Sequence, residues 1–285
     1  MLSDPIKIPK DGKMLTYLYR TVPGRAMLKF LSSRMISDAC GRFMDSSLSL
    51  SLIEGFADKN GIDMSEYEDE FYTCFNSFFT RHIRPELRPV DLDSSSFIAP
   101  CDGLLSAYHI HSGFVVPIKQ SEYNIYDLVR DHRVADMYEN GVCLVFRLCV
   151  NNYHRYCYPD NGIKSMNRHI DGELHTVRPV ALRSLPVFTR NSREYCLIKT
   201  ENFGTVMMME VGAMLVGRIC NHDDECRVKK GREMGYFEYG GSTVVLFIKD
   251  GKVSFPEELF DATDNGMETP VLMGECIGTA LKSRK

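Results

Sequence analysis

Short apolar runs separated by turn residues fill the chain from Phe97 onward, and this spacing constrains the fold more than any other feature. The runs are 113–117, 141–150, 195–198, 206–211 and 243–248. Runs of this length, with β-branched residues inside them and turn residues near their ends, are typical of strands. The spacing therefore predicts a mainly antiparallel β core rather than alternating β-α units.

Helical patterns precede this region. Apolar residues recur at helical spacing behind Pro23-Gly24, at Met27, Leu28, Leu31, Met35 and Ile36. A second pattern covers 64–80 and carries Tyr67, Phe71, Phe75, Phe78 and Phe79. These patterns predict an α+β protein in which a helical N-terminal region, residues 1–80, packs on a β-rich core, residues 81–285. The segment 81–90, with two prolines, is the expected connection.

The stretch 14–36 mixes apolar residues with Arg20, Arg25, Lys29 and Arg34. A basic amphipathic helix of this kind can lie in a lipid interface, or its apolar face can pack on a protein core. The pattern leaves both interpretations open. No run of 18 apolar residues occurs in the chain, so we expect no membrane-spanning segment.

The composition argues against several classes of protein. The net charge of -4 gives no support for nucleic-acid binding, which usually requires a basic face. The ten cysteines are scattered, no pair has Cys-x-x-Cys spacing and no signal peptide precedes them. We therefore expect reduced thiols in a cytosolic protein rather than disulfides or structural zinc. The sequence contains no His-Glu-x-x-His or similar cluster, so it does not predict a catalytic metal.

Gly240-Gly241-Ser242-Thr243 stands directly before a β-branched apolar run, where a flexible turn would enter a strand. There the Ser242 hydroxyl can attack the carbonyl of Gly241 and convert the peptide into an ester. Elimination then leaves dehydroalanine, and hydrolysis gives a pyruvoyl group. The tetrapeptide alone is equally compatible with an ordinary turn.

Asp102, His154 and Ser242 follow in the order of an orienting carboxylate, a proton shuttle and a nucleophile. Each has a plainer interpretation, since Asp102 precedes a glycine in a turn signal and a lone histidine is often structural. His175 is a weaker candidate for the base. The Gly-x-Ser-x-Gly pattern of a serine hydrolase does not surround Ser242.

Several segments, in order from about residue 70 to 250, resemble the phosphatidylserine decarboxylases, a family of pyruvoyl enzymes. The matching segments are Phe78-Phe79-Thr80-Arg81, Arg84-Pro85, Arg88-Pro89-Val90-Asp91, Pro100-Cys101-Asp102-Gly103, Tyr153-His154-Arg155, Val187-Phe188, Val211-Gly212-Ala213-Met214, Glu233-Met234-Gly235-Tyr236-Phe237 and Gly240-Gly241-Ser242-Thr243. The ordered set is specific, although each segment alone is short.

The resemblance implies self-cleavage between Gly241 and Ser242. The products would be a β chain, residues 1–241, and an α chain, residues 242–285, whose first residue becomes the pyruvoyl cofactor. The amine of phosphatidylserine would form a Schiff base with this ketone, and loss of CO2 would give phosphatidylethanolamine. The resemblance also implies peripheral attachment to an anionic membrane at the cytoplasmic face, and family members tend to be dimers.

One position departs from the family pattern. Cys157 stands where the family commonly has a second histidine that serves in self-processing. Three candidates remain for the base: His154, which we favour, His175, and Cys157 activated by Arg155. Two further functions stay open, a non-catalytic lipid-binding relative and a pyruvoyl decarboxylase of another serine-headed lipid.

Overall fold

The computed structural model describes residues 2–8, 12–111, 115–118, 121–173, 175, 181, 187–212, 218–239 and 242–281. Its largest sheet has the strand order β1-β17-β3-β6-β15-β11-β10-β8-β13, with β9 paired to β10, and all of its pairings are antiparallel. The predicted antiparallel β core is therefore confirmed. The central strands are β3 (Gly103–His109), β6 (Val142–Leu148), β15 (Ser242–Ile248), β11 (Thr205–Val211) and β10 (Arg193–Thr200).

The other elements lie around these strands. The remaining strands of the large sheet are β1 (Ile6–Lys7), β8 (Gly162–Lys164), β9 (Arg168–Ile170), β13 (Cys226–Val228) and β17 (Met267–Val271). Smaller sheets contain β2 (Ser96–Ile98), β16 (Val253–Ser254) and β18 (Cys276–Ala280), then β7 (Arg155–Cys157), β12 (Ile219–Asn221) and β14 (Glu233–Phe237), and finally β4 (Val115–Ile118) with β5 (Ser121–Asn124). The helices beside them are α6 (Ile125–Val129), α7 (His132–Ala135), α9 (Val187–Arg190) and α10 (Glu257–Asp264).

Both faces of the large sheet are covered, which explains the nearly continuous apolar runs in β6, β11 and β15. Side chains on one face pack with α6, α7 and α9 in a first core that includes Val145, Val211 and Val245. Those on the other face pack with α10, β7 and β14 in a second core that includes Leu148, Val244 and Phe237. Because side chains alternate along a strand, neighbouring residues of β15 enter different cores.

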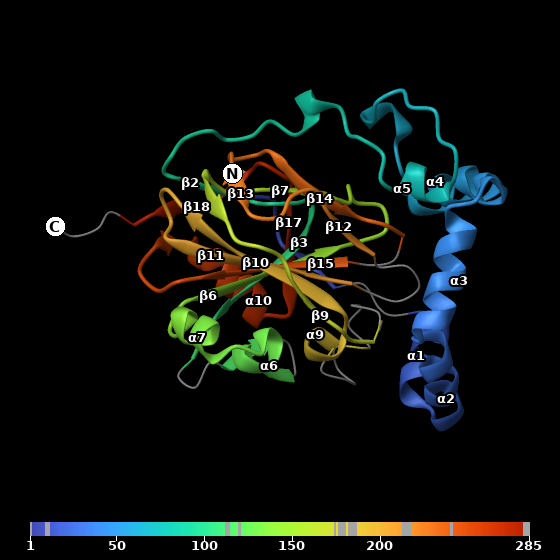
Figure 1. The fold of residues 1–285 in the computed structure, drawn as a ribbon, viewed down its shortest axis with the longest axis horizontal. Helices are drawn as coiled ribbons and strands as arrows, with labels where there is room; N and C mark the ends of the chain where they lie inside the picture. Colours follow the sequence, from blue (N-terminus) through green and yellow to red (C-terminus); the bar gives the residue numbers. More distant parts are fainter. Residues whose placement is uncertain are drawn as a thin grey trace.

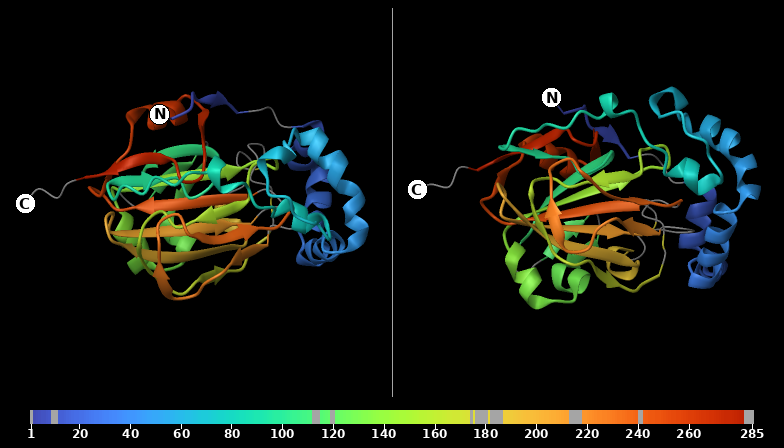
Figure 2. Two further views of the ribbon diagram at one scale, coloured as in Figure 1. Left: turned by 90° about the horizontal axis from the view of Figure 1, so that it is seen from above. Right: turned by 45° about the horizontal axis from the view of Figure 1, so that its top comes forward.

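Helices α1 (Lys13–Arg20), α2 (Val22–Leu31) and α3 (Arg34–Met44), here called the N-terminal arm, stand at one end of the β structure (Figures 1 and 2). The amphipathic stretch predicted over 14–36 is thus divided among three helices. Its first break falls at Thr21, whose backbone is extended and whose Oγ1 accepts a hydrogen bond from the Gly24 amide at 3.1 Å. No helix of the described ranges is long and apolar enough to span a bilayer.

The helical pattern over 64–80 is only partly confirmed. After α4 (Ile53–Asn60), a short 3-10 turn covers Met64–Glu66 and the helix α5 covers only Phe75–Phe79. Between them the backbone forms a bridge from Tyr67 to Ile83, and the Arg84 amide binds the Glu66 carbonyl at 3.0 Å. These long-range bonds use backbone groups that a helix would need. Residues 6–7 also depart from the helical expectation, because β1 pairs with β17.

Candidate active site

Ser242 is the first residue of β15 and lies opposite Leu148 at the end of β6. The β-branched run that follows it forms a strand buried along its whole length, so the serine is held at the edge of the core. Ser242 is 0% exposed, and its Oγ has no hydrogen-bond partner in the described part of the chain. A buried hydroxyl without a partner is costly in a purely structural position. Gly240 and Gly241 of the predicted cleavage site lie outside the described residues.

Asp102 directly precedes β3, which is separated from β15 only by β6. Neighbouring strands lie about 5 Å apart, so the backbones of Asp102 and Ser242 are roughly 10 Å apart across one end of the sheet. The carboxylate is buried and binds Arg88, with Nε at 2.8 Å and Nη2 at 2.6 Å, while the Met273 amide donates at 2.9 Å. Asp102 is therefore paired with an arginine, and no described histidine binds it.

His154 lies on the connection between β6 and β7 and is 1% exposed. Its Nδ1 donates to the Asn152 carbonyl at 2.8 Å, which leaves the lone pair on Nε2, an atom without a partner among the described residues. Burial lowers the pKa of His154 to about 3; the bond to Asn152 opposes this shift and the charge of Arg81 adds to it. The ring is therefore a neutral proton acceptor at physiological pH.

Aromatic packing connects His154 with the segment that enters β15. The His154 ring lies against Phe79, with 4.1 Å between ring centroids, and Tyr239 contacts the same phenylalanine at 5.3 Å. The Phe237 amide also donates to the His154 carbonyl at 3.0 Å. His154 is therefore packed with the segment 237–239, whose last residue is three positions before Ser242 in the chain.

His175 has partners for both ring nitrogens. Its Nε2 lies 2.7 Å from a Glu173 carboxylate oxygen, and its Nδ1 lies 3.4 Å from the Tyr19 hydroxyl of the N-terminal arm. Asn191 connects the His175 carbonyl with that of Gly212, donating to each at 2.7 Å. His175 thus joins the arm to the sheet, and its ring has no unpaired nitrogen for a second reaction partner.

Cys157 is fully buried, and the structure does not favour its activation. Burial raises its pKa to about 12, and the charges of Glu233 and Asp102 act in the same direction. The expected cationic neighbour, Arg155, donates to Glu233 at 2.7 Å and to the Thr80 carbonyl at 2.7 Å. The thiol is therefore protonated at neutral pH and is a poor base.

The strands that pair with β15 each contain a charged residue that was not singled out from the sequence. Arg147 of β6 lies opposite Thr243 and forms a buried ion pair with Glu268 of β17. Glu210 of β11 is 0% exposed and lies opposite Val244. The sequence signal that could have identified them is a charged residue within an otherwise apolar run, because charged side chains are seldom fully buried unless they are paired.

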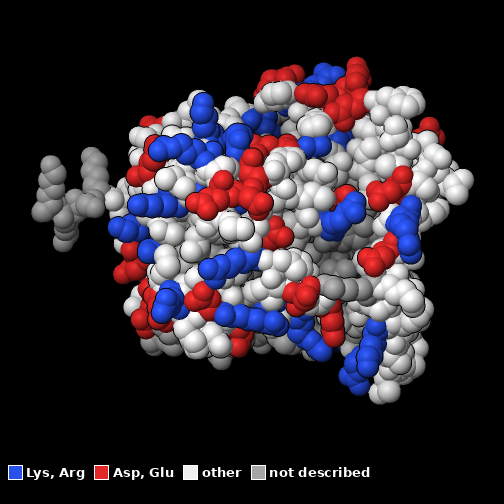
Figure 3. Space-filling model, viewed as in Figure 1, with Lys and Arg blue, Asp and Glu red and all other residues white. Residues whose placement is uncertain are grey.

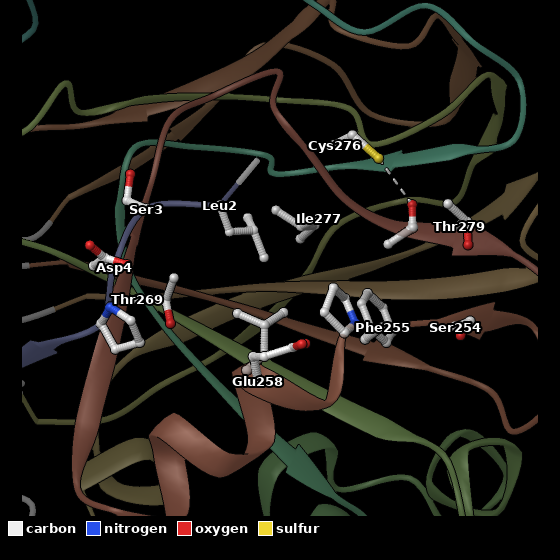
Figure 4. A pocket seen from close by; sticks show the side chains of 14 residues that line it. Leu2, Ser3, Asp4, Ser254, Phe255, Glu258, Thr269, Cys276, Ile277 and Thr279 are labelled. Carbon is white, nitrogen blue, oxygen red and sulfur yellow. Dashed lines mark hydrogen bonds between the residues drawn. The ribbon is translucent and has the colours of Figure 1, made fainter.

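A cavity of about 710 Å³ lies elsewhere in the molecule, between the N-terminal segment, α10 and β18. Figure 4 shows Leu2, Ile277 and Phe255 among the side chains that line it. Its lining includes none of Asp102, His154 and Ser242, so it is separate from the candidate active site. Glu68, Glu70 and His82 form the one group of the described residues with atoms close enough to share a metal ion, and they too are not site residues.

Comparison with known proteins identifies the family of the chain. Residues 75–279 match the family model for phosphatidylserine decarboxylase. Phosphatidylserine decarboxylase proenzyme 2 of Clostridium acetobutylicum is 43% identical over 270 residues, covering 94% of this chain and 92% of that protein. The phosphatidylserine decarboxylase proenzyme of Clostridium perfringens is 41% identical, covering 93% and 92%, and that of Ruminiclostridium cellulolyticum is 40% identical, covering 96% and 93%. The chain therefore belongs to the phosphatidylserine decarboxylase family.

Proposed function

We propose that the chain is a self-processing phosphatidylserine decarboxylase that cleaves itself before Ser242 and releases CO2 from phosphatidylserine. The observation that carries the proposal is the buried Ser242 hydroxyl, which has no partner in the described ranges and stands at the head of a central strand. This environment fits a serine that becomes a pyruvoyl group. A ketone at this position supplies an electron sink for decarboxylation of an amino-acid headgroup.

His154 is the proposed proton acceptor for the first step of processing. Its neutral Nε2 takes the proton of the Ser242 hydroxyl as Oγ bonds to the Gly241 carbonyl carbon, and returns it to the Ser242 nitrogen as the peptide bond breaks. The proton is only transferred from one atom of Ser242 to another, so a weak base is sufficient. Asp102, held by Arg88, is a positioning residue in this proposal, because its two oxygens fix the beginning of β3 against the 81–90 segment.

The intact mass under denaturing conditions tests the processing. The wild-type chain should give two species, 1–241 and 242–285, the smaller lighter by one ammonia than a serine-started peptide. Ser242→Ala should give one species of 285 residues, and Ser106→Ala, which removes another buried serine hydroxyl of the same sheet, should still be processed. A single mass for the wild-type chain, or cleavage of the Ser242→Ala chain, contradicts the proposal.

Decarboxylation is tested with vesicles that contain phosphatidylserine labelled in its carboxyl group. We expect labelled CO2 from the wild-type and Ser106→Ala proteins and none from Ser242→Ala. Processing without release of CO2 would leave the cleavage in place and refute phosphatidylserine as the substrate. Serine-headed lipids with other tails, offered in the same vesicles, would then identify a different substrate.

The N-terminal arm is the proposed contact with an anionic membrane. Residues 12–33 contain Lys13, Arg20, Arg25 and Lys29 and no acidic residue. Leu18, Tyr19 and Leu28 pack into the first core, whereas Met14, Val22 and Phe30 are 69%, 73% and 57% exposed. The lower end of the arm in Figure 3 accordingly shows basic and uncharged side chains. Exposed apolar groups between cations favour the interface of anionic lipids.

Vesicle sedimentation tests this contact. Phe30→Asp should weaken binding to vesicles that contain phosphatidylserine, while Leu92→Asp, which changes a residue 74% exposed outside the arm, should not. Equal binding of both variants and the wild type would exclude the arm as the membrane contact.

A further inference from the structure

Glu210 is a buried carboxyl group that the processing steps above do not use. It lies in β11, is 0% exposed, and its Oε1 has no partner among the residues that the structure describes. Within a strand that is otherwise almost entirely apolar, a buried carboxyl with a free oxygen costs free energy of folding. Its position relative to Ser242 suggests a function for this carboxyl group.

The strand register puts Glu210 and Ser242 on the same face of the sheet. Glu210 pairs with Val244, and Ser242 is two residues before Val244, so all three side chains point into the second core. Diagonal neighbours of this kind are about 7 Å apart, within reach of a long side chain. Continuing the register by one residue places Gly212 level with Ser242, so no side chain of β11 stands beside the serine.

A hydrogen-bond network holds the other carboxylate oxygen of Glu210. The Asn221 amide nitrogen donates to Glu194 Oε1 at 2.8 Å and lies 3.4 Å from Glu210 Oε2. The Tyr156 hydroxyl orients this amide by donating to its Oδ1 at 3.0 Å. Gly235 leaves room for the pair, since a Cβ there would lie 2.8 Å from the Tyr156 hydroxyl and 3.0 Å from Asn221 Oδ1. The network fixes Oε2 and leaves Oε1 available.

The surroundings of Glu210 favour its protonated form near neutral pH. Burial, followed by the charge of Glu194 directly opposite on β10, raises the pKa of Glu210 to about 8, although Asn221 and Lys164 oppose the shift. Glu210 in turn raises the pKa of Cys101, a buried thiol next to Asp102 on which burial has the largest effect. Glu210 thus lies at the same end of the sheet as Asp102. The titratable groups that face it are Glu194, Lys164, Cys196, Tyr156 and Cys101.

We propose that the Glu210 carboxylate removes the Cα proton of Ser242 in the elimination step of self-processing, a role that rests on the proposed function. In this step the Cα–H electrons form the Cα=Cβ double bond and the Cβ–Oγ bond breaks. Gly241 leaves as the carboxylate end of the 1–241 chain, and Glu210 keeps the proton. Water then hydrolyses the resulting enamine to the ketone and ammonia.

The acyl shift and the elimination require different proton acceptors, and His154 and Glu210 differ accordingly. His154 has only to transfer a proton from Ser242 Oγ to the Ser242 nitrogen, so it need not retain it. Elimination removes a proton from carbon, a much weaker acid, and the acceptor must keep that proton. A buried carboxylate becomes a neutral acid when it does so, which the apolar surroundings of Glu210 favour.

Glu210→Gln separates the elimination from the preceding acyl shift. The variant should accumulate the ester, so that its denatured mass is that of 285 residues. Neutral hydroxylamine added to the folded protein should split it into two chains, the smaller with a serine N-terminus. Ser242→Ala, which forms no ester, should resist hydroxylamine. The expected loss is at least about 100-fold in the rate at which the pyruvoyl chain appears, the scale of general base catalysis.

A second variant keeps the test independent of folding defects. Glu194→Gln removes the charge that raises the Glu210 pKa, so the pH dependence of processing should move to lower pH. In pulse-labelled cell-free synthesis, processing at pH 6.5 should become about tenfold faster for each pKa unit lost.

Three results would overturn the inference. These are wild-type processing of Glu210→Gln, a folded Glu210→Gln chain that resists hydroxylamine, and an unchanged pH profile for Glu194→Gln. Each leaves the proposed function intact if the wild-type chain still yields its pyruvoyl species. A wild-type chain that stays whole and resists hydroxylamine would instead refute both.

Discussion

Replacing His154 with phenylalanine tests whether this imidazole is held neutral in a dry pocket. The pKa of His154 is lowered to about 3 from the ordinary value of 6.5 because its charged form would lose its hydration. The folded-state pKa lies below the unfolded one, so as the pH falls the unfolded chain takes up the proton first. His154 therefore contributes stability above pH 6.5 and loses it progressively down to about pH 3.

The size of the effect follows from the shift. Each pKa unit corresponds to about 1.4 kcal/mol, so the whole shift of three and a half units is worth roughly 5 kcal/mol of unfolding free energy. At pH 5, which is one and a half units below the histidine pKa of the unfolded chain, the loss of unfolding free energy is about 2 kcal/mol. Other titrating groups change the stability as well, but they are shared by the parent and the variant.

Urea unfolding of the Ser242→Ala chain, with and without His154→Phe, isolates the histidine. The Ser242→Ala background keeps both proteins as single chains, so that processing does not alter the transition. Between pH 7 and pH 5 the parent should lose about 2 kcal/mol more unfolding free energy than the His154→Phe variant. An equal loss in both proteins would mean that the ring is hydrated or charged in the folded state, and the neutral acceptor at Nε2 would have to be abandoned.

Four further substitutions have definite expected results. Arg88→Met leaves the buried Asp102 carboxylate unpaired and should lower the unfolding free energy by about 3–5 kcal/mol in urea titrations; a loss below about 1 kcal/mol would contradict the pairing. Cys157→Ala should leave processing unchanged, because burial keeps this thiol protonated with its pKa raised to about 12, and a single mass of 285 residues would show otherwise. Gly235→Ala places a Cβ 2.3 Å from the Cys220 carbonyl and should lower the unfolding free energy, measured in urea titrations, by about 1–3 kcal/mol. The same change at Gly55, where no atom lies within 4 Å, should be neutral or stabilising by up to about 1 kcal/mol.

The central strands could be predicted from the sequence because burial on both faces leaves a direct mark on composition. The run 244–248 is apolar at every position, and it belongs to a strand that contributes side chains to both cores. The aromatic pattern over 64–80 was misleading for the opposite reason. Phe75, Phe78 and Phe79 gather in one cluster on a helix of five residues, whereas Tyr67 belongs to a different cluster beside Ile83. Periodicity alone does not distinguish these two arrangements.

For the candidate site, the sequence predicted the place of Ser242 in the fold but not the contacts of its proposed neighbours. Ser242 was placed at a strand entrance by its glycines and the following β-branched run, and the structure has it there. The carboxylate expected to orient a histidine is bound by Arg88, fourteen positions earlier in the chain. Glu210 is a neighbour of Ser242 only through the register of β11 against β15. Contacts of this kind depend on long-range pairing, which local patterns do not specify.

The central place of β15 also determines the kinetic order of refolding. This strand pairs with β6 along its whole length and with β11 from Thr243 to Phe247, and β17, farther along the same chain, lies between β1 and β3. In the uncut precursor these strands enter the sheet by an intramolecular, first-order process. In the processed form that we propose, the bond before Ser242 is broken, and an unfolded protein must recover these strands by a bimolecular encounter of two separate chains. The refolding rate of the processed protein then depends on protein concentration, so a dilute sample refolds more slowly than a concentrated one.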